Sequence, residues 1–125
     1  MRIDHIGFVV ADTEAYLGHL PMRQVLRTLY DPIQKAQLTL VDGGTTRIEL
    51  IEPRSEESFT WNFLQKGGGW HHICYEVDNL VAAQAAMKEA RMIPVRGPLP
   101  APLLEGEVLF ARNRNREMVE FLWRG

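Results

Sequence analysis

Two histidines and two glutamates in this 125-residue sequence are of the residue types that bind divalent metal ions. His5 and His72 each lie in a segment with strand-like alternation, and Glu49 and Glu120 are each flanked by apolar residues. Imidazole nitrogens and carboxylate oxygens are ligands for zinc, nickel, cobalt, manganese or iron, with water in the remaining positions. A lone histidine or glutamate on a strand is more often structural, so the metal hypothesis depends on the four occurring together.

These four residues occupy matching positions in two similar halves of the chain. Segments 4–10 and 71–77 both have isoleucine directly after a histidine, an aromatic residue at the third place after it and valine at the fifth. Segments 47–51 and 118–122 both have a glutamate between apolar residues. Such internal repetition indicates two copies of one structural plan.

Local patterns predict an α+β fold in which each half has the element order β-α-β-β-β. Strands are expected near 2–10, 23–30, 36–42, 46–52, 72–77, 107–112 and 117–123, and helices from Asp12 to before Pro21 and over 79–91. The proline-rich stretch 94–102 is expected to be an irregular loop. We predict one domain over residues 1–125, with a first module at 1–53, a linker at 54–70 and a second module at 71–125.

Successive side chains of a strand point to opposite faces, so each strand separates its polar residue from its apolar neighbours. His5 is expected to face away from Ile6 and Phe8, and Glu120 away from Val119 and Phe121. The apolar faces should pack against the helices. If the two halves are related by pseudo-twofold symmetry, the two histidines and two glutamates converge on the other face.

Composition excludes several classes of function. Fourteen basic and sixteen acidic residues give a formal net charge of −2, which argues against a nucleic-acid or polybasic membrane partner. No apolar run is long enough for a transmembrane helix, and the charged N-terminal segment does not resemble a signal peptide. Cys74 is the only cysteine, so no internal disulfide forms. We therefore expect a cytoplasmic protein.

The other polar candidates have simpler interpretations. His71 points away from the His72 face, and His19 lies on the short first helix, so both are expected to be structural or solvent-exposed. Cys74 is expected to be a small core residue, and Glu76 a charge at the rim of the site. The glycines at 67–69 are not followed by lysine and serine or threonine, which argues against a phosphate-binding loop.

Four segments together resemble the vicinal oxygen chelate superfamily, and most closely its methylmalonyl-CoA epimerase and glyoxalase-like branch. These segments are 4–10, 48–53, 68–77 and 119–121. The resemblance implies paired βαβββ modules that form an open, cupped, mixed β-sheet barrel with helices outside. It also implies one divalent metal ion, with His5, Glu49, His72 and Glu120 as ligands, and often a homodimer.

The chemistry implied by the resemblance is that of an isomerase or lyase acting on a small carbonyl or acyl-thioester substrate. Binding of a carbonyl oxygen to the metal acidifies the adjacent C–H bond and stabilises the enolate. A nearby carboxylate removes and returns the proton, and Glu120, with Glu49 as its counterpart, is the candidate. Epimerases of this branch use a further carboxylate on the preceding strand, where Gln37 and Thr39 are expected to face the site.

Two alternatives remain open at this stage. The first is a non-catalytic binding protein of the same fold, similar to antibiotic-sequestering members, which usually lack the metal ligands. The second is an iron-dependent, dioxygenase-like enzyme, a group that typically uses two histidines and one glutamate, so Glu49 would be additional. In each case the expected partner is a small molecule.

Overall fold

The computed structural model describes residues 1–125, which form two compact units. The N-terminal unit comprises Ile6–His71, and the C-terminal unit comprises Met1–His5 together with His72–Gly125. Two strands pass from one unit to the other: β1 (Arg2–Val9) and β5 (Gly69–Glu76). No helix has the length and apolar character required to cross a membrane.

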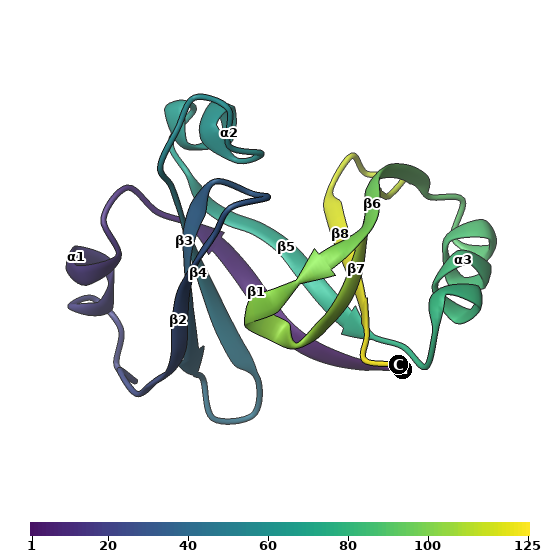
Figure 1. Ribbon diagram of the computed structural model, residues 1–125, viewed down its shortest axis with the longest axis horizontal. Helices are drawn as coiled ribbons and strands as arrows, with labels where there is room; N and C mark the ends of the chain where they lie inside the picture. Colours follow the sequence, from purple (N-terminus) through teal and green to yellow (C-terminus); the bar gives the residue numbers. More distant parts are fainter. The chain divides into compact units, whose positions relative to one another are not determined.

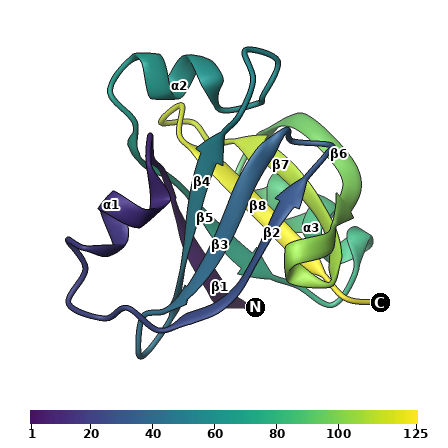
Figure 2. The same ribbon diagram turned by 60° about the vertical axis from the view of Figure 1, so that its left-hand side comes forward.

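The N-terminal unit has a sheet in which the β2-β3 and β3-β4 pairs are antiparallel, with a short helix on one face. It contains α1 (Thr13–Leu17), β2 (Val25–Asp31), β3 (Ala36–Asp42), β4 (Arg47–Pro53) and α2 (Trp61–Gln65). Its strands are ordered β2-β3-β4-β1, as the neighbouring ribbons of Figure 2 show. Tyr16 and Leu17 of α1 pack against Val41 and Leu50, and Figure 1 shows α1 beside this sheet. The apolar faces of β3 and β4 thus hold α1 in place.

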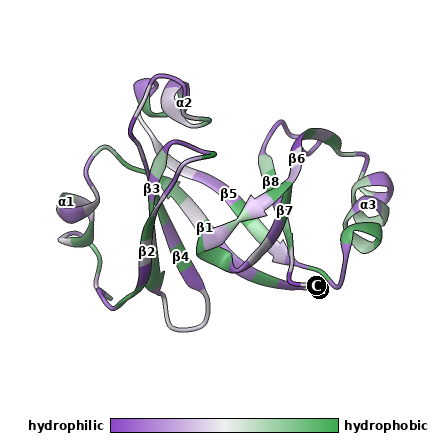
Figure 3. Cartoon of the chain, in the orientation of Figure 1, coloured by the Kyte–Doolittle hydropathy of each residue, from purple (hydrophilic) through white to green (hydrophobic).

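The C-terminal unit follows the same plan with a longer helix. It contains α3 (Leu80–Glu89), β6 (Ile93–Ala101), the short 3₁₀ helix η1 (Pro102–Leu104), β7 (Gly106–Arg112) and β8 (Met118–Trp123). Its strands are ordered β1-β5-β8-β7-β6, with β5 and β8 parallel and the β8-β7 and β7-β6 pairs antiparallel. Ala83 and Met87 of α3 pack on Phe121 and Trp123. In Figure 3, α3 has both hydrophobic and hydrophilic segments, as expected for a helix with one buried face.

The predicted α+β class and the repeated β-α-β-β-β order are confirmed, with α2 between the two copies. Both helices begin where capping predicts, because Asp12 accepts a hydrogen bond from the Ala15 amide and Asn79 from the Ala82 amide. The first helix is shorter than expected and ends at Leu17. The division into modules 1–53 and 71–125 stays a prediction.

The expectation of an irregular loop at 94–102 is wrong, because β6 extends over Ile93–Ala101. This strand is the last in its sheet and pairs only with β7. On an edge strand, a proline whose nitrogen faces solvent removes no ladder hydrogen bond, because no neighbouring strand lies on that side. The register shifts between Pro94 and Arg96, and again between Arg96 and Leu99, which lets the proline-rich sequence continue as a strand.

Candidate metal centre

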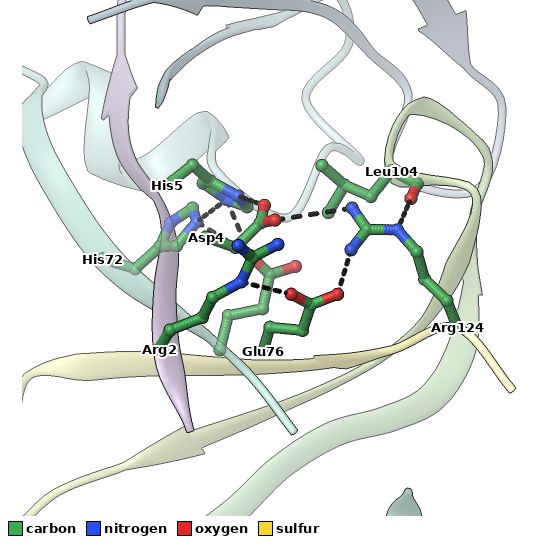
Figure 4. A network of polar contacts seen from close by, with 8 residues as sticks. Arg2, Asp4, His5, His72, Glu76, Leu104 and Arg124 are labelled. Atoms are coloured by element: carbon green, nitrogen blue, oxygen red, sulfur yellow. Dashed lines mark hydrogen bonds and ion pairs between the residues drawn. The ribbon is translucent and has the colours of Figure 1, made fainter. Parts of the chain in front are cut away.

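Three of the four predicted ligands come together in the C-terminal unit. His5 Nε2 lies 3.1 Å from His72 Nε2, and each of these nitrogens lies 3.0 Å from Oε1 of Glu120. The three residues come from β1, β5 and β8, which are neighbouring strands. None of them is more than 2% exposed. The rings of His5 and His72 lie edge to face, with an interplanar angle of 84°, and Figure 4 shows them next to each other.

Strand alternation explains why these side chains share a face. Val119 and Phe121 belong to the core beneath α3, and Tyr75 of β5 packs against that core. His72 and Glu120 alternate with these residues and therefore point to the opposite face of the sheet. The apolar residues that hold the helix thus also orient the polar ones.

The spacing of the three donors fits a metal ion. Two ligands at right angles, each about 2.1 Å from an ion, lie about 3.0 Å apart, which matches the distances in this cluster. Oε1 of Glu120 is buried without a hydrogen-bond partner, although Nε2 of His5 and Nε2 of His72 each lie 3.0 Å from it. A buried carboxylate oxygen in this position is destabilising unless a cation or a donor satisfies it. The residues present are therefore suitable metal ligands.

Glu120 is held in its ionised form. Burial opposes ionisation of this carboxyl group, but the interactions with the His5 and His72 imidazoles outweigh burial and keep the pKa of Glu120 below its ordinary value. An ionised glutamate between two imidazoles supplies one of the negative charges that a divalent cation requires.

Glu49, the fourth predicted ligand, is in the N-terminal unit. It lies on β4 and is 4% exposed. Its neighbours Ile48 and Leu50 pack into the core that contains α1, so Glu49 points to the opposite face of that sheet. Its participation in the same site as His5 stays a prediction.

Gln37 and Thr39 do not lie on the face where we expected them. The antiparallel register pairs Leu40 with Glu49 and Thr39 with Leu50, and directly paired residues share a face. Gln37 and Thr39 therefore lie on the α1 face, where the Gln37 side-chain amide donates to Thr28 Oγ1 and the two threonine hydroxyls are 3.0 Å apart. The β3 residues on the Glu49 face are Ala36, Leu38, Leu40 and Asp42. Strand alternation divides the β3 side chains into two sets, and only the register with β4 decides which set shares the Glu49 face.

Sequence reasoning missed Asp4 and Arg124, which lie next to the cluster (Figure 4). Asp4 Oδ2 is 2.8 Å from His5 Nδ1, and Asp4 Oδ1 is 3.4 Å from Arg124. Arg124 also pairs with Glu76, whose other oxygen accepts a hydrogen bond of 2.7 Å from Arg2. The position of Asp4 directly before a candidate ligand was the available signal, but strand alternation places adjacent side chains on opposite faces and hid it.

The remaining candidates have structural roles. Cys74 is fully buried, and burial together with the nearby Glu120 charge raises the pKa of its thiol, so it is not an activated nucleophile. The ring of His71 packs edge to face against Phe63, with centroids 4.9 Å apart. His19 makes a similar contact with Tyr16 at 6.3 Å.

Glu76 gives the C-terminal unit a pH-dependent contribution to stability. Its hydrogen bond from Arg2 and the charge of Arg124 lower the pKa of Glu76 in the folded protein. The contribution is therefore present above the unfolded-state pKa of about 4.3 and is lost as the pH falls through the lower folded-state value. We expect Glu76→Gln to lower the free energy of unfolding at pH 7 by at most about 1 kcal/mol, because the pair is near the surface.

Urea unfolding at pH 7 and at low pH measures this effect. The difference in the free energy of unfolding between wild type and Glu76→Gln should shrink on acidification. Glu107→Gln, at an exposed position, is the control and should match wild type at both pH values. A difference that does not change with pH would show that the ion pair with the arginines is not its source.

A family model decides the relationship of the chain to known proteins. Residues 4–110 match the model of the glyoxalase/bleomycin resistance protein/dioxygenase superfamily. The chain belongs to this superfamily. The match includes most of β1, with His5, and most of β7, and the resemblance found in the sequence motifs is thereby confirmed. The mixed α+β architecture with repeated β-α-β-β-β elements is that of the vicinal oxygen chelate fold.

Relatives that are similar in sequence include epimerases. Human mitochondrial methylmalonyl-CoA epimerase is 34% identical over 96 residues, which cover 73% of this chain and 54% of that protein. The ethylmalonyl-CoA/methylmalonyl-CoA epimerase of Cereibacter sphaeroides is 36% identical over 95 residues, covering 71% and 70%. The chain thus spans about half the length of the human relative.

Solved structures with the same fold include proteins with and without a stated activity. A hypothetical protein from Bacillus halodurans C-125 has a TM-score of 0.86 at 29% identity and covers 99% of this chain and 94% of its own. Methylmalonyl-CoA epimerase from Mycobacterium tuberculosis has a TM-score of 0.82 at 22% identity, with 99% and 88% covered. At 22% identity, the latter comparison supports the fold alone.

Proposed function

We propose that this superfamily member is a divalent-metal-dependent epimerase that acts on an acyl-CoA thioester. The main supporting observation is the buried set of three donor atoms on His5, His72 and Glu120, which lie 3.0–3.1 Å apart. The names of the human and Cereibacter relatives support epimerisation as the reaction and a malonyl-type thioester as the substrate class.

In this proposal, His5, His72 and Glu120 hold the metal ion, and Glu49 is the fourth ligand. The bound ion would act as a Lewis acid on the thioester carbonyl, which acidifies the C–H bond at the adjacent carbon. The two imidazoles bind through Nε2, which leaves each Nδ1 available to be held by a neighbouring group. The metal could be zinc, nickel, cobalt, manganese or iron, because nitrogen and oxygen donors suit them all.

Epimerisation requires that a proton is removed from one side of a carbon and returned to the other. We assign this acid–base work to Glu120 and Glu49. The face of β3 that Glu49 shares presents Leu38 and Leu40, which supply no carboxylate, and Asp42, whose carboxylate accepts a hydrogen bond from the Gly44 amide. Proton transfer therefore falls to the two glutamates that also serve as candidate ligands. A carboxylate that is loosely held by the ion is free to accept a proton.

Metal loading followed by isotope exchange tests the proposed function. The purified protein is stripped of metal, reloaded with cobalt, manganese, nickel, zinc or iron in turn, and incubated in D₂O with methylmalonyl-CoA or ethylmalonyl-CoA. We expect one deuterium to enter at the carbon adjacent to the thioester, together with inversion of configuration, and only in metal-loaded protein. Exchange is followed by mass spectrometry and configuration by a stereospecific coupled assay.

Other outcomes distinguish the alternatives. Exchange without inversion would support enolate formation but contradict epimerisation of these substrates, leaving the lyase and glyoxalase-like reactions open. Oxygen consumption by the iron form would indicate a dioxygenase. Tight substrate binding without exchange would identify a binding protein, and failure of every metal to bind would contradict the proposal. Sedimentation of the same samples would test whether the chain forms the homodimer that the family resemblance implies.

A further inference from the structure

We propose that Asp4 is a positioning residue that fixes the tautomer of His5 for metal binding, and that Arg124 holds Asp4 in place. This inference rests on the proposed metal function. It concerns residues that lie outside the four predicted ligands and that connect the buried cluster to the protein surface. All of them belong to the C-terminal unit.

The contact between Asp4 and His5 determines where the imidazole proton lies. Asp4 Oδ2 is 2.8 Å from His5 Nδ1, and the side chains are 3% and 0% exposed. An ionised carboxylate is acceptor-only, so it favours the tautomer in which Nδ1 carries the proton. That tautomer leaves the lone pair on Nε2, the atom that is 3.0 Å from Glu120 Oε1. A carboxylate partner also makes the imidazole a better metal ligand.

Arg124 provides the counter-charge that a buried carboxylate requires. One terminal nitrogen of Arg124 lies 3.4 Å from Asp4 Oδ1, and its Nε donates to the carbonyl of Leu104 at 2.9 Å. Its other terminal nitrogen pairs with Glu76. The guanidinium group is therefore held at three points, and its planar shape directs one side toward Asp4. The side chain of Arg124 is 33% exposed, so it reaches the buried pair from the surface.

Arg2 offers a matched comparison because it also binds Glu76. Its Nε donates to Glu76 Oε1 at 2.7 Å, and its side chain is 76% exposed. The two arginines share one carboxylate, but the ion pair with Asp4 is made by Arg124. Removing Arg124 should therefore disturb the arrangement at His5, whereas removing Arg2 should not.

Cobalt titration of the full chain measures the effect on the metal site. The dissociation constant of Co²⁺ is determined by competition with a coloured chelator for wild type, Asp4→Asn, Arg124→Gln and Arg2→Gln. We expect Asp4→Asn to weaken cobalt binding by about 10- to 100-fold, which is the usual effect of losing such a partner. Arg124→Gln should weaken it in the same direction by a smaller factor, and Arg2→Gln should bind as wild type does.

The tautomer of His5 is measured independently of metal. Long-range ¹H–¹⁵N correlation spectra of metal-free protein should show the proton on Nδ1 in wild type and in Arg2→Gln, and a changed or mixed tautomer in Asp4→Asn. If thermal melting shows that Asp4→Asn does not fold, the test is made by comparing the His5 tautomer and the cobalt affinity of Arg124→Gln with those of Arg2→Gln.

The two readouts separate the positioning role from the metal function. If wild type binds cobalt while the Asp4 and Arg124 variants match it in affinity and tautomer, the positioning role is overturned and the proposed function stands. If no cobalt binds but the tautomer depends on Asp4, the metal function fails and the positioning of His5 is supported.

Discussion

Metal binding should fall most when His72 is replaced by alanine. The substitution removes one of three donors that lie 3.0–3.1 Å apart, and an apolar methyl group cannot replace a nitrogen ligand. Because loss of a residue that only supports a ligand already weakens binding about 10- to 100-fold, we expect a larger loss for His72→Ala. Metal content after equilibrium dialysis, together with the cobalt dissociation constant, measures it.

His71→Ala is the matched control for this prediction. His71 is adjacent in sequence but alternates to the other face of β5, where its ring contacts Phe63. It should retain wild-type metal affinity. If His72→Ala retained that affinity as well, with unchanged thermal stability, the cluster would not be a metal site and the structural interpretation of the histidines would hold.

Proton exchange should fall most when Glu120 is replaced by glutamine. The amide preserves the shape of the side chain but cannot accept a proton as a carboxylate does. Positioned acid–base groups contribute about 10²- to 10⁴-fold to rates, and we expect a loss in this range for the deuterium exchange of methylmalonyl-CoA by Glu120→Gln. The rate is measured under saturating metal, so that weakened metal binding does not account for the loss.

Comparison with Glu49→Gln separates the two candidate bases. If each glutamate acts on one side of the reacting carbon, both variants should lose inversion. Each variant should still exchange the proton of the one stereoisomer that its remaining glutamate can deprotonate. Glu107→Gln, at an exposed position near the start of β7, is the control and should keep the wild-type rate. Wild-type exchange by Glu120→Gln at full metal occupancy would remove Glu120 from the role of base.

The element order was predictable because each signal is local. Alternating apolar residues predict the strands, and Asp12 and Asn79 predict the helix starts, because a side chain at the N-cap satisfies amides only three residues away. The pairing of His5 with His72 was predictable for a different reason. The repeat places both on equivalent strands, and β1 and β5 are neighbours in the sheet.

The errors have a common origin in the pairing of strands. Gln37 and Thr39 were expected to face the site, but the register pairs Leu40 with Glu49, which places Gln37 and Thr39 on the α1 face. A shift of one residue moves a whole strand to the other face, and local sequence does not specify that shift. The proline-rich β6 was missed because tolerance of proline depends on the edge position of the strand in the sheet.

The sequence by itself determined which residues are chemically suited to bind a metal ion, which face of its strand each occupies relative to its neighbours, and the superfamily to which the chain belongs. Only the tertiary structure showed that His5, His72 and Glu120 are within 3.1 Å of one another, and that Arg124 reaches back to Asp4 across 120 residues of chain. The physical reason is that side-chain alternation is a property of one strand, whereas distances between strands depend on register and packing. Those distances decide whether suitable residues form a site.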